Sequence, residues 1–86
     1  MDIRELRLQI DEIDDGIVRL FCERMRVAEG IARFKAENGL PVVDAERERR
    51  KLEDVLGKTE PGFREYMSAL YSLIFELSRE YQETLL

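Results

Sequence analysis

The chain has 86 residues, of which 44% are hydrophobic and 38% charged, and its formal net charge is −5. This composition predicts one small folded domain and argues against a disordered chain. The acidic balance argues against a general nucleic-acid-binding protein, and no apolar run approaches the roughly 18 residues that a membrane span needs. No apolar segment follows the charged N-terminus, so we expect no signal peptide and a cytoplasmic protein.

The chain contains no histidine and a single cysteine, Cys22. Without histidine, a Ser-His-Asp or Cys-His arrangement is impossible, and no zinc or other metal site is expected. The lone cysteine excludes an intramolecular disulfide, and its place in a helical pattern predicts a small buried residue. An enzyme of this composition would run a reaction that needs little proton transfer.

The first of three helical patterns extends from about Asp2 to about Glu37. Asn38-Gly39 and the following Pro41 are typical of a helix C-terminus. Apolar residues recur at steps of three, four or seven and form a stripe along one side of this helix. The members of the stripe are Ile3, Leu6, Ile10, Ile13, Ile17, Leu20, Val27 and Ile31.

Two shorter helices follow, and no strand pattern is present. Asp44 is suited to cap the second helix, which is expected to end near Gly57. Thr59 or Glu60 would cap the third, because Pro61 is tolerated in a first turn. The apolar residues of the third helix are Phe63, Met67, Leu70, Ile74, Leu77, Tyr81 and Leu85.

The lengths of these helices predict how the chain is assembled. The first helix would be about 54 Å long at 1.5 Å per residue, and the two shorter helices cannot cover it from one chain. An antiparallel homodimer, in which each long helix packs along its twin, would leave no part of the stripe uncovered. The sequence therefore predicts an all-α fold with residues 1–86 as a single domain, three helices per chain, in an intertwined homodimer.

Two cations interrupt the apolar stripe of the first helix. Arg24 lies seven residues after Ile17 and seven before Ile31, and Lys35 follows three turns later on nearly the same face. Cations in a core need a counter-ion or a hydrated opening. One interpretation pairs Arg24 with Glu48 or another acid and extends Lys35 to solvent at the helix end. The other gives both cations a ligand to bind.

Arg7 does not share this face. It lies 17 residues before Arg24, which rotates it by roughly 100° about the helix axis. Within one chain, an ordinary exposed arginine is the simpler interpretation. In an antiparallel dimer, the partner helix could deliver Arg7 to the site.

The charged residues of the second helix divide into two faces. Glu48 precedes Leu52 by four residues and so lies on the apolar side, with Arg47 at its edge. The remaining charged residues are expected to form a solvated face, made of Arg49, Arg50, Lys51 and Glu53.

Ser78 and Gln82 are one turn apart beside the apolar stripe of the third helix. A buried pair of this kind can bond to the backbone or to each other. Combined with Arg24, Lys35 and Glu48, however, the pair borders a core in which cations outnumber acids. Such a pocket suits a small dianion with two carboxylates and a few neutral oxygens. No nucleophile has an adjacent base, so positioning and electrostatics would supply any catalysis.

Four segments together resemble the all-α, AroQ-type chorismate mutases over almost the whole chain. The resemblance implies an intertwined all-helical homodimer with two active sites. It also implies a Claisen rearrangement of chorismate to prephenate, with no cofactor and no covalent enzyme intermediate, in phenylalanine and tyrosine biosynthesis. The segments are "LRLQIDEIDDGIVRLFCER" (Leu6–Arg24), "IARFK" (Ile31–Lys35), "GLPVVDAERE" (Gly39–Glu48) and "ELSREYQ" (Glu76–Gln82).

The resemblance also implies roles at the substrate carboxylates. Arg7 is similar to the arginine donated across the dimer, and Arg24 to the one from the site's own chain. Both would hold substrate carboxylates, with Ser78 in support. Arg47 would order its neighbours in the site.

At the other substrate oxygens, the resemblance implies four more roles. Lys35 is similar to the lysine that contacts a carboxylate and the ether oxygen of the breaking C–O bond, and Gln82 to the second donor to that oxygen. Glu48 and the backbone of Asp44 match the groups that bind the ring hydroxyl.

Two other functions stay open on sequence grounds. An isochorismate-pyruvate lyase on the same fold would cleave its substrate rather than rearrange it. A non-catalytic helical dimerisation module would leave the cationic pocket without a role.

Overall fold

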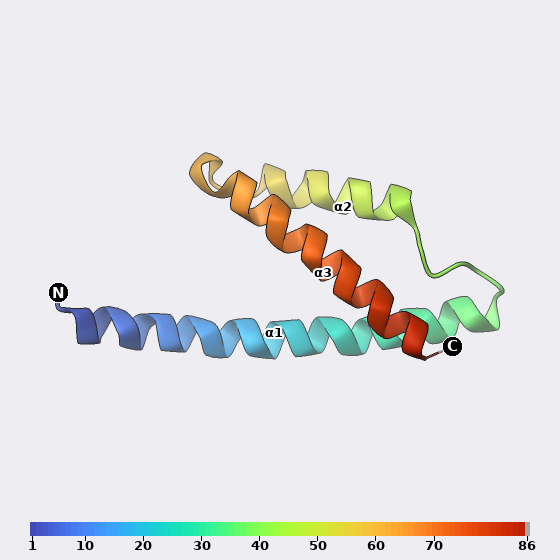
Figure 1. Ribbon diagram of the computed structural model, residues 1–86, viewed down its shortest axis with the longest axis horizontal. Coiled ribbons are helices and arrows are strands. Elements are labelled where there is room, and N and C mark those ends of the chain that lie inside the picture. The colour runs from blue at the N-terminus through green and yellow to red at the C-terminus, as the bar shows by residue number, and fades with distance from the viewer. Residues whose placement is uncertain (86) are drawn as a thin grey trace.

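The computed structural model describes residues 1–85, which form three α-helices and one short 3-10 helix (Figure 1). Helix α1 is Ile3–Glu37 and α2 is Ala45–Gly57, and η1, Pro61–Phe63, leads into α3, Arg64–Thr84. The three predicted helices are confirmed, and the described residues contain no strand. None of these helices is both long enough and apolar enough to cross a membrane. The predicted start of the third helix is a 3-10 turn rather than the first α-helical turn.

Side-chain caps fix the start of α1 and α2. The Asp2 carboxylate accepts a hydrogen bond from the backbone N–H of Glu5 at 3.0 Å. The Asp44 carboxylate accepts one from the backbone N–H of Arg47 at 3.0 Å, which confirms the predicted cap of α2. Each bond satisfies a backbone donor that has no partner within its helix.

The end of α1 follows the predicted stop signal. Asn38 is the C-cap, and Gly39 has a φ of +64°, a conformation that costs residues with a Cβ more than it costs glycine. The Asn38 side-chain amide donates to the carbonyl of Phe34 at 2.8 Å. The chain therefore leaves α1 sharply and turns back toward α2.

The connection between α2 and α3 uses Thr59 and Glu60 differently from the prediction. The Thr59 hydroxyl donates to the carbonyl of Val55 at 2.6 Å, so it closes the end of α2. Glu60 precedes Pro61 as the N-cap residue, but its side chain makes no capping bond.

Helix α3 joins the other two helices. Its backbone packs close to those of both α1 and α2, whereas the backbones of α1 and α2 do not approach each other in the part of the chain that is described. Figure 1 shows α2 and α3 as an antiparallel pair, with the C-terminal end of α3 lying against the C-terminal part of α1. The N-terminal half of α1 projects beyond both.

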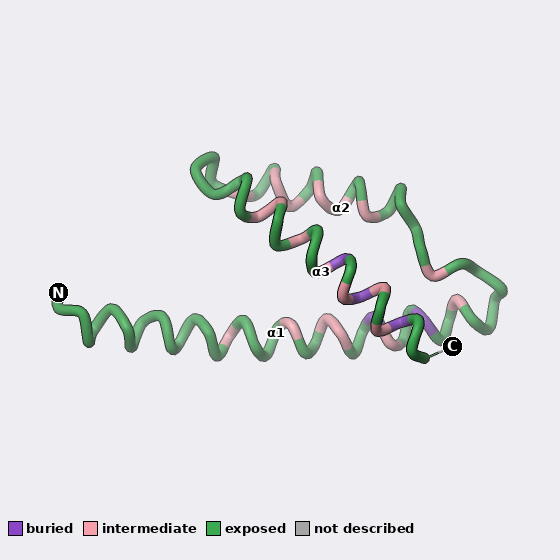
Figure 2. The backbone as a smooth tube through the Cα atoms, in the orientation of Figure 1, coloured by how far each residue is buried: buried purple, intermediate pink, exposed green. Residues whose placement is uncertain are grey.

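The core is small and lies where α3 crosses α1. Its apolar members are Ala28, Ala32 and Phe75, and the polar Ser78 and Gln82 are buried with them (Figure 2). The two alanines have small side chains, which lets the backbones of two helices approach closely. The core therefore holds polar groups at its centre.

Most of the predicted apolar stripe of α1 is uncovered in the single chain. Ile10, Ile13 and Ile17 are each more than half exposed, and Figure 2 colours no residue at this end of α1 as buried. Cys22 is also exposed, so the prediction of a buried cysteine is wrong for the single chain. Uncovered apolar surface of this extent marks an interaction site.

Candidate active site

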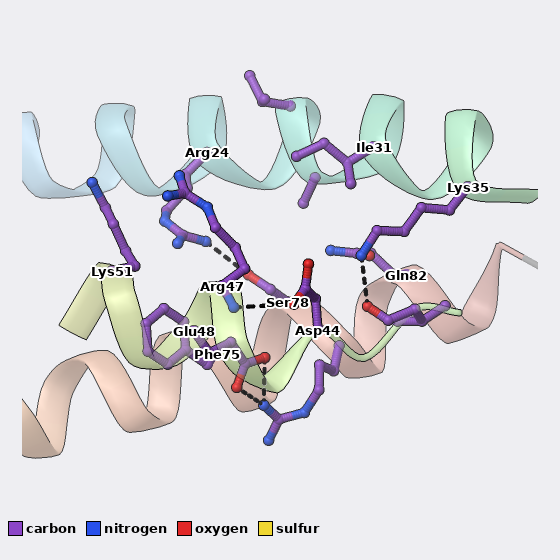
Figure 3. Close-up of a pocket in the computed structure, with 14 residues that line it drawn as sticks. Arg24, Ile31, Lys35, Asp44, Arg47, Glu48, Lys51, Phe75, Ser78 and Gln82 are labelled. Atoms are coloured by element: carbon purple, nitrogen blue, oxygen red, sulfur yellow. Dashed lines mark hydrogen bonds and ion pairs between the residues drawn. The ribbon is translucent and has the colours of Figure 1, made fainter. Parts of the chain in front are cut away.

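A pocket of about 330 Å³ lies between α1, α2 and α3 (Figure 3). Every predicted site residue except Arg7 lines it. The lining residues are Arg24, Val27, Ala28, Ile31, Lys35, Val42, Asp44, Arg47, Glu48, Lys51, Phe75, Ser78, Arg79 and Gln82. Residues from three helices and one loop thus surround a single cavity.

Arg24 is held by a hydroxyl and an aromatic ring. Its Nη1 donates to Ser78 Oγ at 3.0 Å, and its guanidinium lies 6.0 Å from the centroid of the Phe75 ring. No carboxylate pairs with Arg24 among the described residues, so the predicted alternative of an Arg24–Glu48 pair is wrong. A guanidinium with five donors and one neutral partner keeps most of its capacity for an anion.

Lys35 turns inward rather than extending to solvent. Its Nζ donates to the carbonyl of Val42 at 2.9 Å and thereby ties the α1–α2 loop to the pocket. Within residues 1–85 it has no carboxylate partner. Since an ammonium has three donors, two remain for a ligand.

Gln82 is a buried amide without a partner for its oxygen. The residue is only 8% exposed, and its Oε1 accepts no hydrogen bond from the described residues. A Ser78–Gln82 bond, one of the alternatives left open by the sequence, is absent: Ser78 Oγ accepts from Arg24 and donates to Met25 Sδ at 4.0 Å. An unpaired buried polar atom costs stability and calls for an explanation, such as a ligand that it binds. Figure 3 shows Gln82 near Lys35 at one end of the pocket and Arg24 at the other.

The two acids of the pocket are already engaged. The Asp44 carboxylate caps α2, as described above. The Glu48 carboxylate accepts two hydrogen bonds from Arg79 Nη1, at 2.5 and 2.7 Å. The hydrogen bond to Glu48 raises the pKa of the Arg79 guanidinium above its ordinary value. With both acids engaged, the free charges that face the cavity are positive.

Two further cations, Arg47 and Lys51, line the pocket from α2. Arg47 is exposed at the start of α2 and has no ion-pair partner among the described residues. Lys51 was expected on the solvated face, but its side chain is only 34% exposed and lines the pocket, so that expectation is wrong. A pocket with this surplus of cations, in a chain of net charge −5, suits a small molecule with more than one carboxylate.

Residues 6–83 match the sequence profile described as chorismate mutase type II. The structure of chorismate mutase (form II) from Thermus thermophilus is similar, with a TM-score of 0.90 and 33% identity, over 94% of this chain and 93% of that one. The chain belongs to the type II chorismate mutase family. The resemblance found in the sequence is thereby confirmed.

Two curated relatives are longer than this chain. A bifunctional chorismate mutase/prephenate dehydratase of Buchnera aphidicola is 37% identical over 99% of this chain and 23% of its own length. A chorismate mutase of Methanocaldococcus jannaschii is 43% identical over 55% of this chain and 48% of its own. The chain thus matches less than half the length of each of these relatives.

Two charged pocket residues of this family member were given no site role from the sequence. Arg79 directly follows Ser78 and precedes Gln82 by three residues, so its position on α3 was readable. Lys51 follows Glu48 by three residues and therefore shares its side of α2. The spacing was visible for both, but long charged side chains at the edge of a stripe are usually solvated.

Arg7 is the predicted site residue that the single chain leaves outside the pocket. It is exposed on the N-terminal half of α1, which projects away from α2 and α3. Its place in a site remains a prediction that depends on a second copy of the chain.

Proposed function

We propose that the protein is a cytoplasmic chorismate mutase that rearranges chorismate to prephenate, in phenylalanine and tyrosine biosynthesis. Family membership and the names of its relatives support this activity. The observation that carries the proposal is the pair of polar groups with hydrogen-bond donors to spare at one end of the pocket. Lys35 uses one of its three donors on the Val42 carbonyl, and no hydrogen bond joins the buried Gln82 side-chain amide to another described residue.

Chorismate is a dianion with two carboxylates, an ether oxygen and a ring hydroxyl. Arg24 would bind a carboxylate, because Ser78 and Phe75 already hold its guanidinium in one orientation. Fixing a carboxylate selects the compact chair-like conformer in which the enolpyruvyl carbon meets the ring. Binding energy would thus be used to bring the reacting atoms together.

In the rearrangement, the ether C–O bond breaks while a C–C bond forms, and no proton is transferred. Negative charge develops on the ether oxygen as the bond breaks. Lys35 and the Gln82 amide would donate to that oxygen and stabilise the transition state more than the ground state. A reaction of this kind needs no general base, which is consistent with a chain that has no histidine.

The ring hydroxyl would bind at the α2 side of the pocket. The Glu48 carboxylate and the backbone of Asp44 would contact it, and Arg47 would order this end of the helix. Glu48 suits the role because a carboxylate accepts the hydrogen bond of a hydroxyl. No cofactor or metal takes part in the proposed reaction.

The proposed active unit is a homodimer in which α1 packs antiparallel along its twin. The exposed stripe that includes Ile10, Ile13 and Ile17 supports this assembly, because a second copy would cover it. Arg7 would then reach the pocket of the other copy and bind a substrate carboxylate there. The site would therefore need residues from both chains.

Purified protein incubated with chorismate tests the proposal directly. Consumption of chorismate, followed by ultraviolet absorbance, together with formation of prephenate is the expected result. Salicylate formed from isochorismate, without prephenate from chorismate, would instead identify the lyase. No turnover of either substrate would leave the helical dimerisation module as the function and overturn the proposed activity.

A further inference from the structure

The Arg79–Glu48 ion pair differs from every other ion pair of the described residues. Each of the others joins residues three or four apart on one helix or at its end. This pair joins α2 to α3, and its side chains are only 32% and 27% exposed. A partly buried pair is screened less by solvent and salt than an exposed one. The Arg79–Glu48 pair can therefore hold the Glu48 carboxylate in one place.

The geometry directs the Glu48 carboxylate toward α3. A single nitrogen, Arg79 Nη1, donates to both carboxylate oxygens, at 2.5 and 2.7 Å. Figure 3 shows the Glu48 carboxylate on the side of the pocket away from α1, while the charged groups of Arg24 and Lys35 lie nearer α1. Arg79 thus keeps the carboxylate apart from both cations.

The charges around Glu48 explain why such a restraint matters. Arg24, Lys35 and Arg47 line the same pocket and have no carboxylate partner among residues 1–85. A carboxylate released from Arg79 would be attracted to these cations, since charge-assisted hydrogen bonds are the strongest available to it. It would then occupy the groups that a dianionic substrate needs.

We propose that Arg79 is a positioning residue that holds Glu48 against α3, so that Glu48 meets the substrate hydroxyl and the pocket cations stay free for the substrate carboxylates. This role rests on the proposed function. It assigns Arg79 no contact with substrate and no part in the bond rearrangement. Because α3 also carries Ser78 and Gln82, the ion pair would place Glu48 relative to the other groups of the site.

The first test compares Arg79→Met with Arg79→Lys. Arg79→Met is expected to lower kcat/KM on the order of tenfold, the size of a coupling between side chains in contact. The loss should fall mainly on KM, since a misplaced Glu48 competes with the bound substrate as well as with the transition state. Arg79→Lys should recover most of the loss, because one nitrogen makes both contacts in the parent protein.

A double-mutant cycle with Glu48→Gln separates positioning from direct binding. The neutral amide has no charge to compete for the pocket cations, and its oxygen can still accept a hydroxyl hydrogen bond. Adding Arg79→Met to Glu48→Gln should therefore cause no further loss. If the full tenfold loss persists in that background, Arg79 acts independently of Glu48 and the proposal is wrong.

Arg49→Met is the matched control. Arg49 is also an arginine bound to glutamates, Glu46 and Glu53, but these pairs are exposed and lie outside the pocket. The Arg49→Met substitution removes the same charge as Arg79→Met and should leave kcat and KM unchanged.

Melting temperature and oligomeric state are measured for each variant. If Arg79→Met lowers the melting temperature with KM and kcat unchanged, the ion pair is only structural and the positioning role is overturned. If the parent protein forms no prephenate at all, the proposed function fails first, and the positioning role fails with it.

Discussion

The two halves of α1 have the same helical periodicity but different surroundings. In the C-terminal half, Ala28 and Ala32 are buried under α3, and Arg24 and Lys35 line the pocket. In the N-terminal half, apolar residues such as Ile13 are more than half exposed and no described helix of the same chain covers them. Apolar periodicity therefore marks a surface that is built to be covered, but it does not say whether the cover comes from the same chain.

The halves also differ in what their cations do. Arg24 and Lys35 each make a hydrogen bond to a group of α3 or of the α1–α2 loop. Arg7 is exposed and lies on the projecting half. If both halves serve one function, we expect Arg7 to act in the pocket of another copy. The following experiments test that difference.

Lys35→Ala is expected to have the largest effect. Loss of a donor to the ether oxygen should lower kcat on the order of 10²–10³-fold, as for other donors to a developing oxyanion. The proposed dimer should persist, because Lys35 lies on the half of α1 that packs against its own chain. Steady-state kinetics and analytical ultracentrifugation measure the two properties.

Arg33→Ala is the control for Lys35→Ala. Arg33 is two residues away on the same helix, is exposed and pairs with Glu29 outside the pocket. Its replacement should leave turnover near the parent value. Near-parental turnover in Lys35→Ala itself would contradict the role of Lys35.

Gln82→Glu should make the reaction depend on pH. The neutral amide donates a hydrogen bond without first having to be protonated. The rate of the parent protein should therefore not change with pH in the neutral and mildly alkaline range. A glutamic acid, with an ordinary pKa of about 4.3, donates only when protonated, so the rate should fall about tenfold per pH unit above its pKa.

Rate profiles of both proteins from acid to mildly alkaline pH check this expectation. A steep loss between about pH 5 and 7 in the parent protein would point to a titrating acid at the ether oxygen. That outcome would contradict the assignment of Gln82.

Arg7→Ala tests whether the projecting half supplies a site. Loss of a charge-assisted hydrogen bond to a carboxylate should lower kcat/KM about 10- to 100-fold. In a dimer that shares its sites, mixing Arg7→Ala chains with Lys35→Ala chains should restore activity. Each hybrid dimer would have one site with both residues intact, so random exchange should recover about a quarter of the parent activity.

The hybrid measurement requires the chains to be unfolded and refolded together, with each variant refolded alone as the control. No recovery in the mixture, with hybrids demonstrated by mass spectrometry, would place Arg7 in its own chain's site or outside any site.

Among these substitutions, Ile13→Asp is expected to have the smallest direct effect on turnover. Ile13 lies far along the projecting half of α1, away from the pocket. Both copies would lose a buried isoleucine, so the dimer should weaken by at least about 3 kcal/mol. Turnover should become dependent on protein concentration, and sedimentation should detect monomer. Full activity in a variant that sediments only as a monomer would contradict the shared site.

Much of the fold was readable from sequence because helix signals are local. Some helix ends are each fixed by a residue beside them. Asp2 and Asp44 cap the starts of α1 and α2, and Gly39 follows the end of α1. The turn before α3 was less predictable, since Thr59 bonds back to α2 instead of forward. Which of two neighbouring polar residues caps which helix depends on where the chain turns.

The candidate site was readable in part. Periodicity identified Arg24, Lys35 and Gln82 as polar residues on apolar faces, because angle about a helix axis follows from residue number alone. It placed Lys51 wrongly in solvent and gave Arg79 no role. Those two side chains are long, and their direction depends on charges contributed by other residues around the pocket.

The sequence by itself determined the three helices, most of their ends and the faces on which the cations lie. Tertiary structure alone decided that Glu48 pairs with Arg79 rather than with Arg24, and that the Gln82 oxygen has no partner among the described residues. The reason is physical: periodicity specifies a direction around one axis, whereas an ion pair between helices requires two axes at a set distance. In this chain that distance is set where α3 packs against α1 and α2.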